Sequence, residues 1–377
     1  MDFELTEEQS LLREMTARLI AEDDAAERAV AADRPDGFSR KRWRRFSELG
    51  LLGLPFDEDQ GGVGGTALET MLVMEQFGRG LVIEPYLASV VLSGNALRLG
   101  DKPELLPGIA AGECLVAFAH QEEQARYDLA HVETGARPNE GGYVLDGTKT
   151  LVLHGDSADW LVVSARLSGE RTDKAGIGLF LVKADARGVT RHGYRTIDGR
   201  RAAEIALSDV SVAADACIGT PGDAFALIER VIAIAIAAVA AEAVGCMNAL
   251  MDLTVEYLKT RKQFGAPIGS FQALQHRAAD MLIATEQARS MAMFAAMMAD
   301  DPDPVARRKA IAAAKVQIGK SGKLVGKEAI QLHGGIGMTD EYKAGHYFKR
   351  LTVIDALFGD ADHHLGVLAR TDGLFSD

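Results

Sequence analysis

The charge-free run VIAIAIAAVAA at 231–241 constrains the fold more than any other stretch of the chain. It is shorter than the roughly 20 residues that a helix needs to cross a bilayer, so it predicts no membrane span. Because no side of such a helix is polar, we expect it to be buried on all sides. A single layer of four helices would bury it only with neighbouring subunits packed on it, which predicts oligomer contacts from Ala224 onward.

Apolar periodicity divides the rest of the chain into expected domains. Helical spacing runs through 1–112, where Thr6 and Gln9 form a predicted capping box at the first helix. Short strands separated by turn residues fill 113–222 and predict a small antiparallel sandwich or barrel. The last part, 223–377, is predicted to be a four-helix bundle, so the fold class is α+β and mostly α. Its helices are expected near 224–260, 271–299, 304–332 and 340–371.

Composition excludes several classes of partner. The 377 residues are 47% hydrophobic and 25% charged, as in ordinary globular proteins, and the net charge of −13 disfavours nucleic acid or an anionic membrane surface. The cysteines Cys114, Cys217 and Cys246 lie far apart, so they predict no metal site and suit a reducing compartment. The acidic start MDFELTEEQ lacks the basic and apolar parts of a secretory signal, and we expect a cytoplasmic protein.

Two motifs could bind a ligand, and the first is RKQFGAPIGSFQ at 261–272. Helical spacing continues up to Thr260, and Gly265 and Pro267 then break it. Arg261 is therefore expected at a helix end, where its guanidinium could bind a phosphate or pyrophosphate through two hydrogen bonds. A solvated arginine favoured by the helix dipole is the simpler interpretation of this run alone.

The second motif is QLHGGIGMT at 331–339. Gly334, Gly335 and Gly337 would let the backbone approach a ligand more closely than residues with a Cβ allow. A helix-ending turn explains the glycines equally well, because no strand precedes them as in a nucleotide-binding fingerprint.

Together, and in this order, the two runs resemble the acyl-CoA dehydrogenase family. The segments FELTEEQSLLRE, ELGLLGLPFDEDQGGVGG and YVLDGTKT extend the resemblance over nearly the whole chain. It implies an FAD cofactor, an acyl-CoA substrate, a helical tetramer and electron-transfer flavoprotein as electron acceptor. In that family the matching positions hold the FAD of a neighbouring subunit; here they are Arg261, Gln263, Phe264, Gln272, Gln331, Gly334 and Gly335.

The catalytic base that the resemblance implies is missing from its usual position. The family places a Glu before a Gly in the segment that reads IDALFGDADHH here, and Gly359 stands at that position. Asp360 beside it is a weak candidate for the base. Glu242, which follows the charge-free run, is another, although a paired structural carboxylate explains it more simply. The sequence therefore leaves the catalytic residue unknown.

The part of the family's site that binds the subunit's own flavin is also altered. AFAHQEEQARYD replaces a TEPxAGSD-like loop, and 151–153 reads LVL where Trp-Ile-Thr or Trp-Ile-Ser is usual. His154 replaces an Asn. His120 and His154 could act as replacement catalysts, but a lone histidine is more often structural.

The chain thus keeps the residues that reach the FAD of a neighbouring subunit, but the part that would bind its own flavin and supply the base is altered. In this it resembles the partner subunit of two-gene acyl-CoA dehydrogenases, of the pimeloyl-CoA or steroid side-chain type. We therefore expect an oxidoreductase of CH–CH donors in fatty-acid or steroid side-chain degradation. The chain would pair with a second, Glu-bearing subunit in a heterotetramer and be inactive alone. The alternatives are an active homotetramer that uses Asp360 or Glu242, a flavin-dependent monooxygenase, and a structural partner without flavin.

Overall fold

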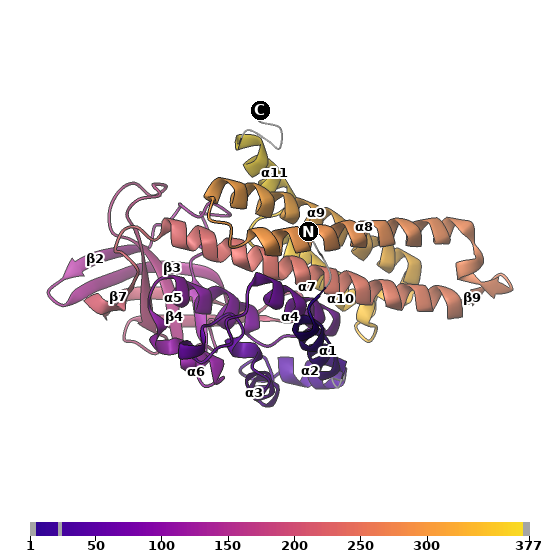
Figure 1. Ribbon diagram of the computed structural model, residues 1–377, viewed down its shortest axis with the longest axis horizontal. Helices are drawn as coiled ribbons and strands as arrows, with labels where there is room; N and C mark the ends of the chain where they lie inside the picture. The colour runs from indigo at the N-terminus through magenta and orange to yellow at the C-terminus, as the bar shows by residue number, and fades with distance from the viewer. Residues whose placement is uncertain (1–4, 22–24, 372–377) are drawn as a thin grey trace. The chain divides into compact units, whose positions relative to one another are not determined.

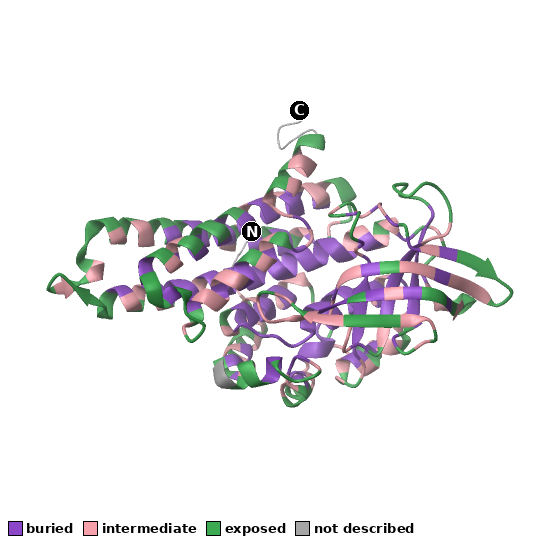
Figure 2. Cartoon of the chain, turned by 180° about the vertical axis from the view of Figure 1, so that it is seen from behind, coloured by how far each residue is buried: buried purple, intermediate pink, exposed green. Residues whose placement is uncertain are grey.

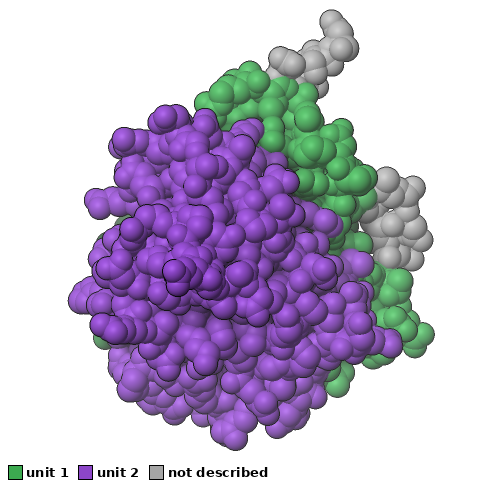
Figure 3. All heavy atoms as spheres, turned by 90° about the vertical axis from the view of Figure 1, so that its left-hand side faces the viewer, with its two compact units in different colours: residues 1–23, 67–82, 236–377 green, residues 24–66, 83–235 purple. Residues whose placement is uncertain are grey.

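The computed structural model describes residues 5–21 and 25–371. The chain forms two compact units, which Figure 3 shows in different colours. The predicted three-domain division follows the order of helical and strand segments and remains a proposal. Unit 1 contains residues 1–23, 67–82 and 236–377, and unit 2 contains residues 24–66 and 83–235.

Unit 1 is mostly helical (Figure 1), and α8 packs against α9, which also contacts α10 and α11. The predicted capping box is confirmed: the Thr6 N–H donates to Gln9 Oε1 at 3.1 Å, and the Gln9 N–H donates to Thr6 Oγ1 at 3.2 Å. The helices are α1 (Glu7–Ala21), α4 (Ala67–Gly80), the later part of α7 (Phe225–Thr260), α8 (Gln272–Met298), α9 (Pro304–His333), α10 (Lys343–Ala356) and α11 (Ala361–Arg370).

The prediction of a single helix over 340–371 is wrong, because the helix is interrupted between α10 and α11. Phe358 and Gly359 have φ values of +60° and +104°, outside the helical region. Asp360 then caps α11 by accepting the His363 N–H at 2.8 Å. The helical spacing of apolar residues continues across this break, so periodicity alone did not reveal it.

The middle of α7 is buried, as predicted, and Figure 2 shows it in purple. Helix α4 packs closely against part of α7, with glycines at the points of contact. A Cβ on Gly78 would lie 2.0 Å from the Glu242 carbonyl oxygen, and one on Gly245 would lie 1.9 Å from that of Glu75. Because the chain's own residues bury 231–241, the inference that neighbouring subunits must cover this run is wrong.

The argument that 231–241 is too short to span a membrane is wrong, because this run is part of the longer helix α7. The helix has 36 residues and is apolar enough to cross a bilayer, but 94% of its most apolar window is buried within the chain. Burial, and not shortness, identifies it as a core helix. No other helix among the described residues meets the same criteria of length and apolarity.

Unit 2 carries the predicted small β domain. Its sheet has the order β6-β7-β3-β2-β4-β5-β8, and β1 pairs with β4. Most pairs are antiparallel, but β1–β4 and β2–β4 are parallel, which alternation of apolar residues cannot reveal. The strands are β1 (Val116–Ala119), β2 (Gly135–Asn139), β3 (Gly142–Leu153), β4 (Trp160–Arg166), β5 (Ile177–Lys183), β6 (Val189–Arg195), β7 (Arg201–Ala213) and β8 (Cys217–Ile218).

The remainder of unit 2 is helical and precedes the sheet in the chain, except for the start of α7. Its main helices are α2 (Ala25–Ala32), α3 (Arg40–Glu48), the π-helix η3 (Tyr86–Gly94), α5 (Asn95–Leu99) and α6 (Leu106–Ala110). Inside the β domain, Leu145, Val163, Phe180 and Ile205 belong to one buried cluster. This core fixes β1 and β3, where the altered segment 117–128 begins and where the altered residues 151–153 lie.

Candidate functional site

The first motif forms a hairpin at the end of α7. The helix ends at Thr260, as predicted, and β9 (Lys262–Gln263) pairs antiparallel with β10 (Ala266–Pro267). The turn residues Phe264 and Gly265 have φ values of +54° and +81°, as a two-residue type I′ turn requires. The turn presents the Phe264 ring to solvent, where 93% of the residue is exposed. The hairpin therefore leaves this ring accessible to a ligand or to another chain.

The backbone of Arg261 is fixed although its side chain is exposed. Its N–H donates to the Tyr257 carbonyl at 2.8 Å, and its own carbonyl accepts the Ile268 N–H at 2.8 Å. These bonds join the helix end to the chain that follows the hairpin. The guanidinium is therefore presented from a rigid backbone, which favours recognition of a phosphate.

The second motif begins where α9 ends. Gly334 caps this helix with φ +62°, and its N–H donates to carbonyls of the last turn. A Cβ on Gly334 or on Gly335 would meet no atom within 4 Å. The space above these glycines is open, so a ligand or another chain can approach their backbone. Gln331, in the last turn of α9, is exposed.

We call residues 261–272 and 331–339 the bundle tip. Every FAD-contacting residue predicted there is exposed: Arg261, Gln263, Phe264, Gln272, Gln331, Gly334 and Gly335. A guanidinium, amide side chains, an exposed ring and open glycine backbone suit the pyrophosphate and flat rings of FAD. The residues present therefore fit this cofactor. No metal-binding group of His, Cys, Asp or Glu occurs among the described residues.

The position of the missing base is closed to a side chain. Gly359 is buried and has φ +104°, a region that residues with a Cβ rarely adopt. A Cβ placed there would lie 2.6 Å from His363 Cδ2 and 2.7 Å from His364 Nε2. His364 itself makes a 3.0 Å hydrogen bond to the Phe358 carbonyl. The local structure thus requires glycine at 359.

A buried lysine of α9 fixes the same segment. Lys315 Nζ donates to the carbonyls of Ile354 at 2.9 Å, Asp355 at 2.8 Å and Gly359 at 2.7 Å. Burial lowers the pKa of Lys315 to about 8. These bonds satisfy carbonyls at the end of α10 and in the turn that follows.

The candidate bases are both engaged in structural contacts. The Asp360 carboxylate accepts the His363 N–H as the cap of α11. The Glu242 carboxylate accepts hydrogen bonds from Arg350 Nε at 2.8 Å and Nη2 at 2.6 Å, and both residues are buried. Neither carboxylate is presented as a free proton acceptor.

The histidines considered as replacement catalysts are buried and neutral. Burial lowers the pKa of His120 to about 3, as does the nearby charge of Lys149. His120 Nδ1 lies 2.9 Å from Ser164 Oγ, and Lys149 Nζ donates to Glu122 Oε1 at 2.6 Å. Burial likewise lowers the pKa of His154 to about 3, and its ring packs edge-on against another ring of unit 2. These contacts describe structural histidines.

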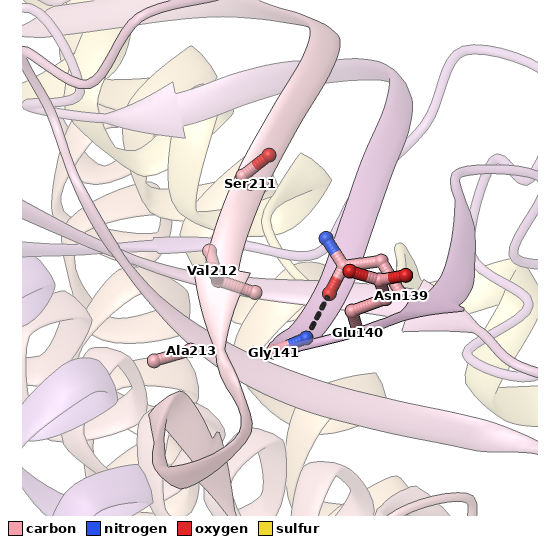
Figure 4. Close-up of a pocket in the computed structure, with 6 residues that line it drawn as sticks. All are labelled: Asn139, Glu140, Gly141, Ser211, Val212 and Ala213. Carbon is pink, nitrogen blue, oxygen red and sulfur yellow. Dashed lines mark hydrogen bonds between the residues drawn. The ribbon is translucent and has the colours of Figure 1, made fainter.

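An open hollow of ≈ 470 Å³ lies at the turn between β2 and β3 (Figure 4). The Gly141 N–H donates to Asn139 Oδ1 at 3.1 Å, and Ser211 lines the hollow from β7. No residue predicted to bind FAD or to act as a base lines it. It adds nothing to the candidate site.

Comparison with known proteins identifies the class. Family models for the acyl-CoA dehydrogenase N-terminal, middle and C-terminal domains match residues 6–113, 117–210 and 225–371. The chain belongs to the acyl-CoA dehydrogenase family. Membership confirms the predicted fold, the oxidoreductase class and, at the level of the family, FAD as cofactor and acyl-CoA dehydrogenation as activity.

Individual relatives align along almost the full chain. The probable acyl-CoA dehydrogenase YngJ of Bacillus subtilis (strain 168) is 32% identical over 379 residues, covering 98% of this chain and 99% of that protein. A solved variant of the Tcur3481-Tcur3483 steroid ACAD is similar at 28% identity, with a TM-score of 0.87 and coverage of 97% and 98%. The ChsE4-ChsE5 complex from Mycobacterium tuberculosis is similar at 26% identity, with a TM-score of 0.87 and full coverage of both chains.

Several residues that shape the site were not predicted from the sequence. Lys315 had a signal, because it is a lone charge within the apolar run AIAAAKVQI of a helix. No sequence signal indicated that His363 and His364 lie against Gly359, since the break before α11 was not predicted. Tyr342, whose ring packs against that of His333, was also not predicted.

Proposed function

We propose that this chain is the partner subunit of a heteromeric acyl-CoA dehydrogenase. It supplies the bundle tip to an FAD site and no catalytic base. The observation that carries the proposal is the closed position at Gly359, where φ and the imidazoles of His363 and His364 exclude a side chain. Dehydrogenation requires a base for the Cα proton, so another subunit must provide it.

The bundle tip would act on the cofactor and not on the substrate. When bound there, FAD would supply the acceptor for the hydride that leaves Cβ of the acyl thioester. Arg261 would bind the pyrophosphate, Phe264 would cover a ring of the cofactor, and the backbone at Gly334 and Gly335 would approach it closely. Gln263, Gln272 and Gln331 would donate amide hydrogen bonds. Exposure of all these groups in the isolated chain supports a site completed by another subunit.

Similarity to heteromeric relatives supports the same assignment. One similar solved structure is a complex of ChsE4 with ChsE5, and another is a steroid ACAD. We therefore propose a heterotetramer with a homologous subunit that carries the Glu. Its substrate would be an acyl-CoA of the steroid side-chain or dicarboxylyl type, and electron-transfer flavoprotein would receive the electrons.

The test compares the chain alone with the chain mixed with a Glu-bearing homologous subunit from the same host. Both are assayed with FAD, a panel of acyl-CoAs and an artificial electron acceptor. We expect turnover only from the mixture, because loss of a general base typically costs about 10²–10⁴-fold in rate. Turnover above about 1 s⁻¹ by the chain alone, abolished by Asp360→Asn, would instead establish an active homomer.

A further inference from the structure

Three rings from separate elements of unit 1 meet where the two motifs leave the bundle. Tyr257 comes from α7, His333 is the last residue of α9, and Tyr342 immediately precedes α10. The His333 ring lies 4.7 Å from that of Tyr257 and 5.0 Å from that of Tyr342, measured between centroids. The tyrosine rings are 6.5 Å apart and steeply inclined to each other. All three distances fall in the range of favourable aromatic pairs.

Each motif is attached directly to this ring cluster, Tyr257–His333–Tyr342. The Tyr257 carbonyl accepts the Arg261 N–H at 2.8 Å, one helical turn before the hairpin. His333 immediately precedes Gly334. The ring cluster therefore joins Tyr257, one turn before the first run, to His333 inside the second run.

The central histidine is held firmly. It is buried, and its Nδ1–H donates to the Ala329 carbonyl at 2.8 Å. Burial lowers its pKa, so the ring is neutral at neutral pH and packs as an uncharged aromatic. The tyrosines on either side are partly exposed, so their removal leaves less of a buried void than a core truncation would.

We propose that Tyr257, His333 and Tyr342 are positioning residues that set the separation of the two runs of the bundle tip, and thereby the affinity of the assembly for FAD. The link to FAD rests on the proposed function. The positioning itself is a property of the chain without cofactor. Loss of one stacked ring would weaken FAD binding by about 2- to 10-fold through this link.

The experiment measures amide hydrogen exchange of the full chain without FAD. The variants are Tyr342→Leu and Tyr257→Leu, with Tyr342→Phe to retain the ring. Phe294→Leu, at an exposed ring of α8, is the matched control. The reporters are the hydrogen-bonded amides of Arg261, Ile268 and Gly334. Each variant that melts cooperatively is then titrated with FAD in the mixture with the Glu-bearing subunit.

We expect faster exchange at these reporters in both Leu variants and wild-type exchange in Tyr342→Phe and Phe294→Leu. FAD affinity should fall in the same Leu variants while the melting temperature of the chain changes little. Wild-type exchange in both Leu variants overturns the inference, and so does faster exchange in Tyr342→Phe. If the wild-type mixture binds no FAD, the proposed function fails, but the exchange data still decide whether the ring cluster positions the two runs.

Discussion

Glu242 on α7 and Arg350 on α10 form a buried ion pair within unit 1, joined by two hydrogen bonds. Their side chains are 1% and 3% exposed. Both carboxylate oxygens of Glu242 accept from the guanidinium, so this carboxylate joins two helices of the bundle. The simpler interpretation of Glu242, a paired structural residue, agrees with this geometry.

The first prediction is that Glu242→Gln destabilises the chain by about 3–5 kcal/mol, because it leaves the Arg350 charge buried without its counter-ion. Urea unfolding of the purified chain measures the change. Glu14→Gln is the control, since the Glu14–Arg18 pair is exposed and should contribute less than about 1 kcal/mol. Equal effects of the two substitutions would contradict a structural role for Glu242.

The second prediction concerns Gly359. Gly359→Ala should cost about 2 kcal/mol or more, because the added Cβ requires an unfavourable φ and contacts the imidazoles of His363 and His364. Gly335→Ala is the control, because its Cβ would enter open space. Free energies of unfolding are compared under the same conditions. Unfolding data in which Gly359→Ala equals the control would remove the main support for the closed base position.

Local signals predicted much of the fold. The capping box at Thr6, the helix end at Thr260 and the buried run 231–241 were correct because each depends on neighbouring residues or on one face of one element. The break at Gly359 was missed because apolar spacing continues across it. The parallel pairing of β1 and β4 was missed because a strand's sequence does not state its partner.

In the candidate site, too, local motifs could be predicted from the sequence, whereas contacts between distant elements could not. The seven residues predicted to bind FAD could be found because they lie in two short contiguous motifs, and all seven are exposed. The contacts of Lys315 with Gly359 and of Tyr342 with His333 join elements distant in sequence. Such contacts depend on how the helices pack, so only the structure could provide them.

The third prediction is a dependence of stability on pH. The pKa of His154 is about 3 in the folded chain because of its burial, against 6.5 for an exposed histidine, so between these values the unfolded chain binds the proton more strongly. Stability therefore falls as pH decreases from 6.5 towards 3, by about 1.4 kcal/mol per pH unit for this residue.

His154→Asn should remove this contribution. Between pH 6 and pH 4.5 the variant should lose about 2 kcal/mol less stability than the wild type, as measured by urea unfolding at both pH values. His154→Gln is a second neutral replacement and should give the same difference. Parallel losses in wild type and both variants would show that His154 does not bind its proton differently on folding.

The fourth prediction tests the bundle tip directly. In the mixture with the Glu-bearing subunit, Arg261→Ala should weaken FAD binding about 10- to 100-fold, because a charge-assisted hydrogen bond contributes about 1.5–3 kcal/mol. Arg261→Lys should recover only part of the affinity, since an ammonium lacks the planar fork that binds two phosphate oxygens. Arg18→Ala, at an exposed arginine of α1, is the control and should retain FAD. Affinity is measured from flavin absorbance near 450 nm after equilibrium dialysis. If Arg261→Ala retains as much FAD as Arg18→Ala, Arg261 does not bind the cofactor and the bundle tip has another role.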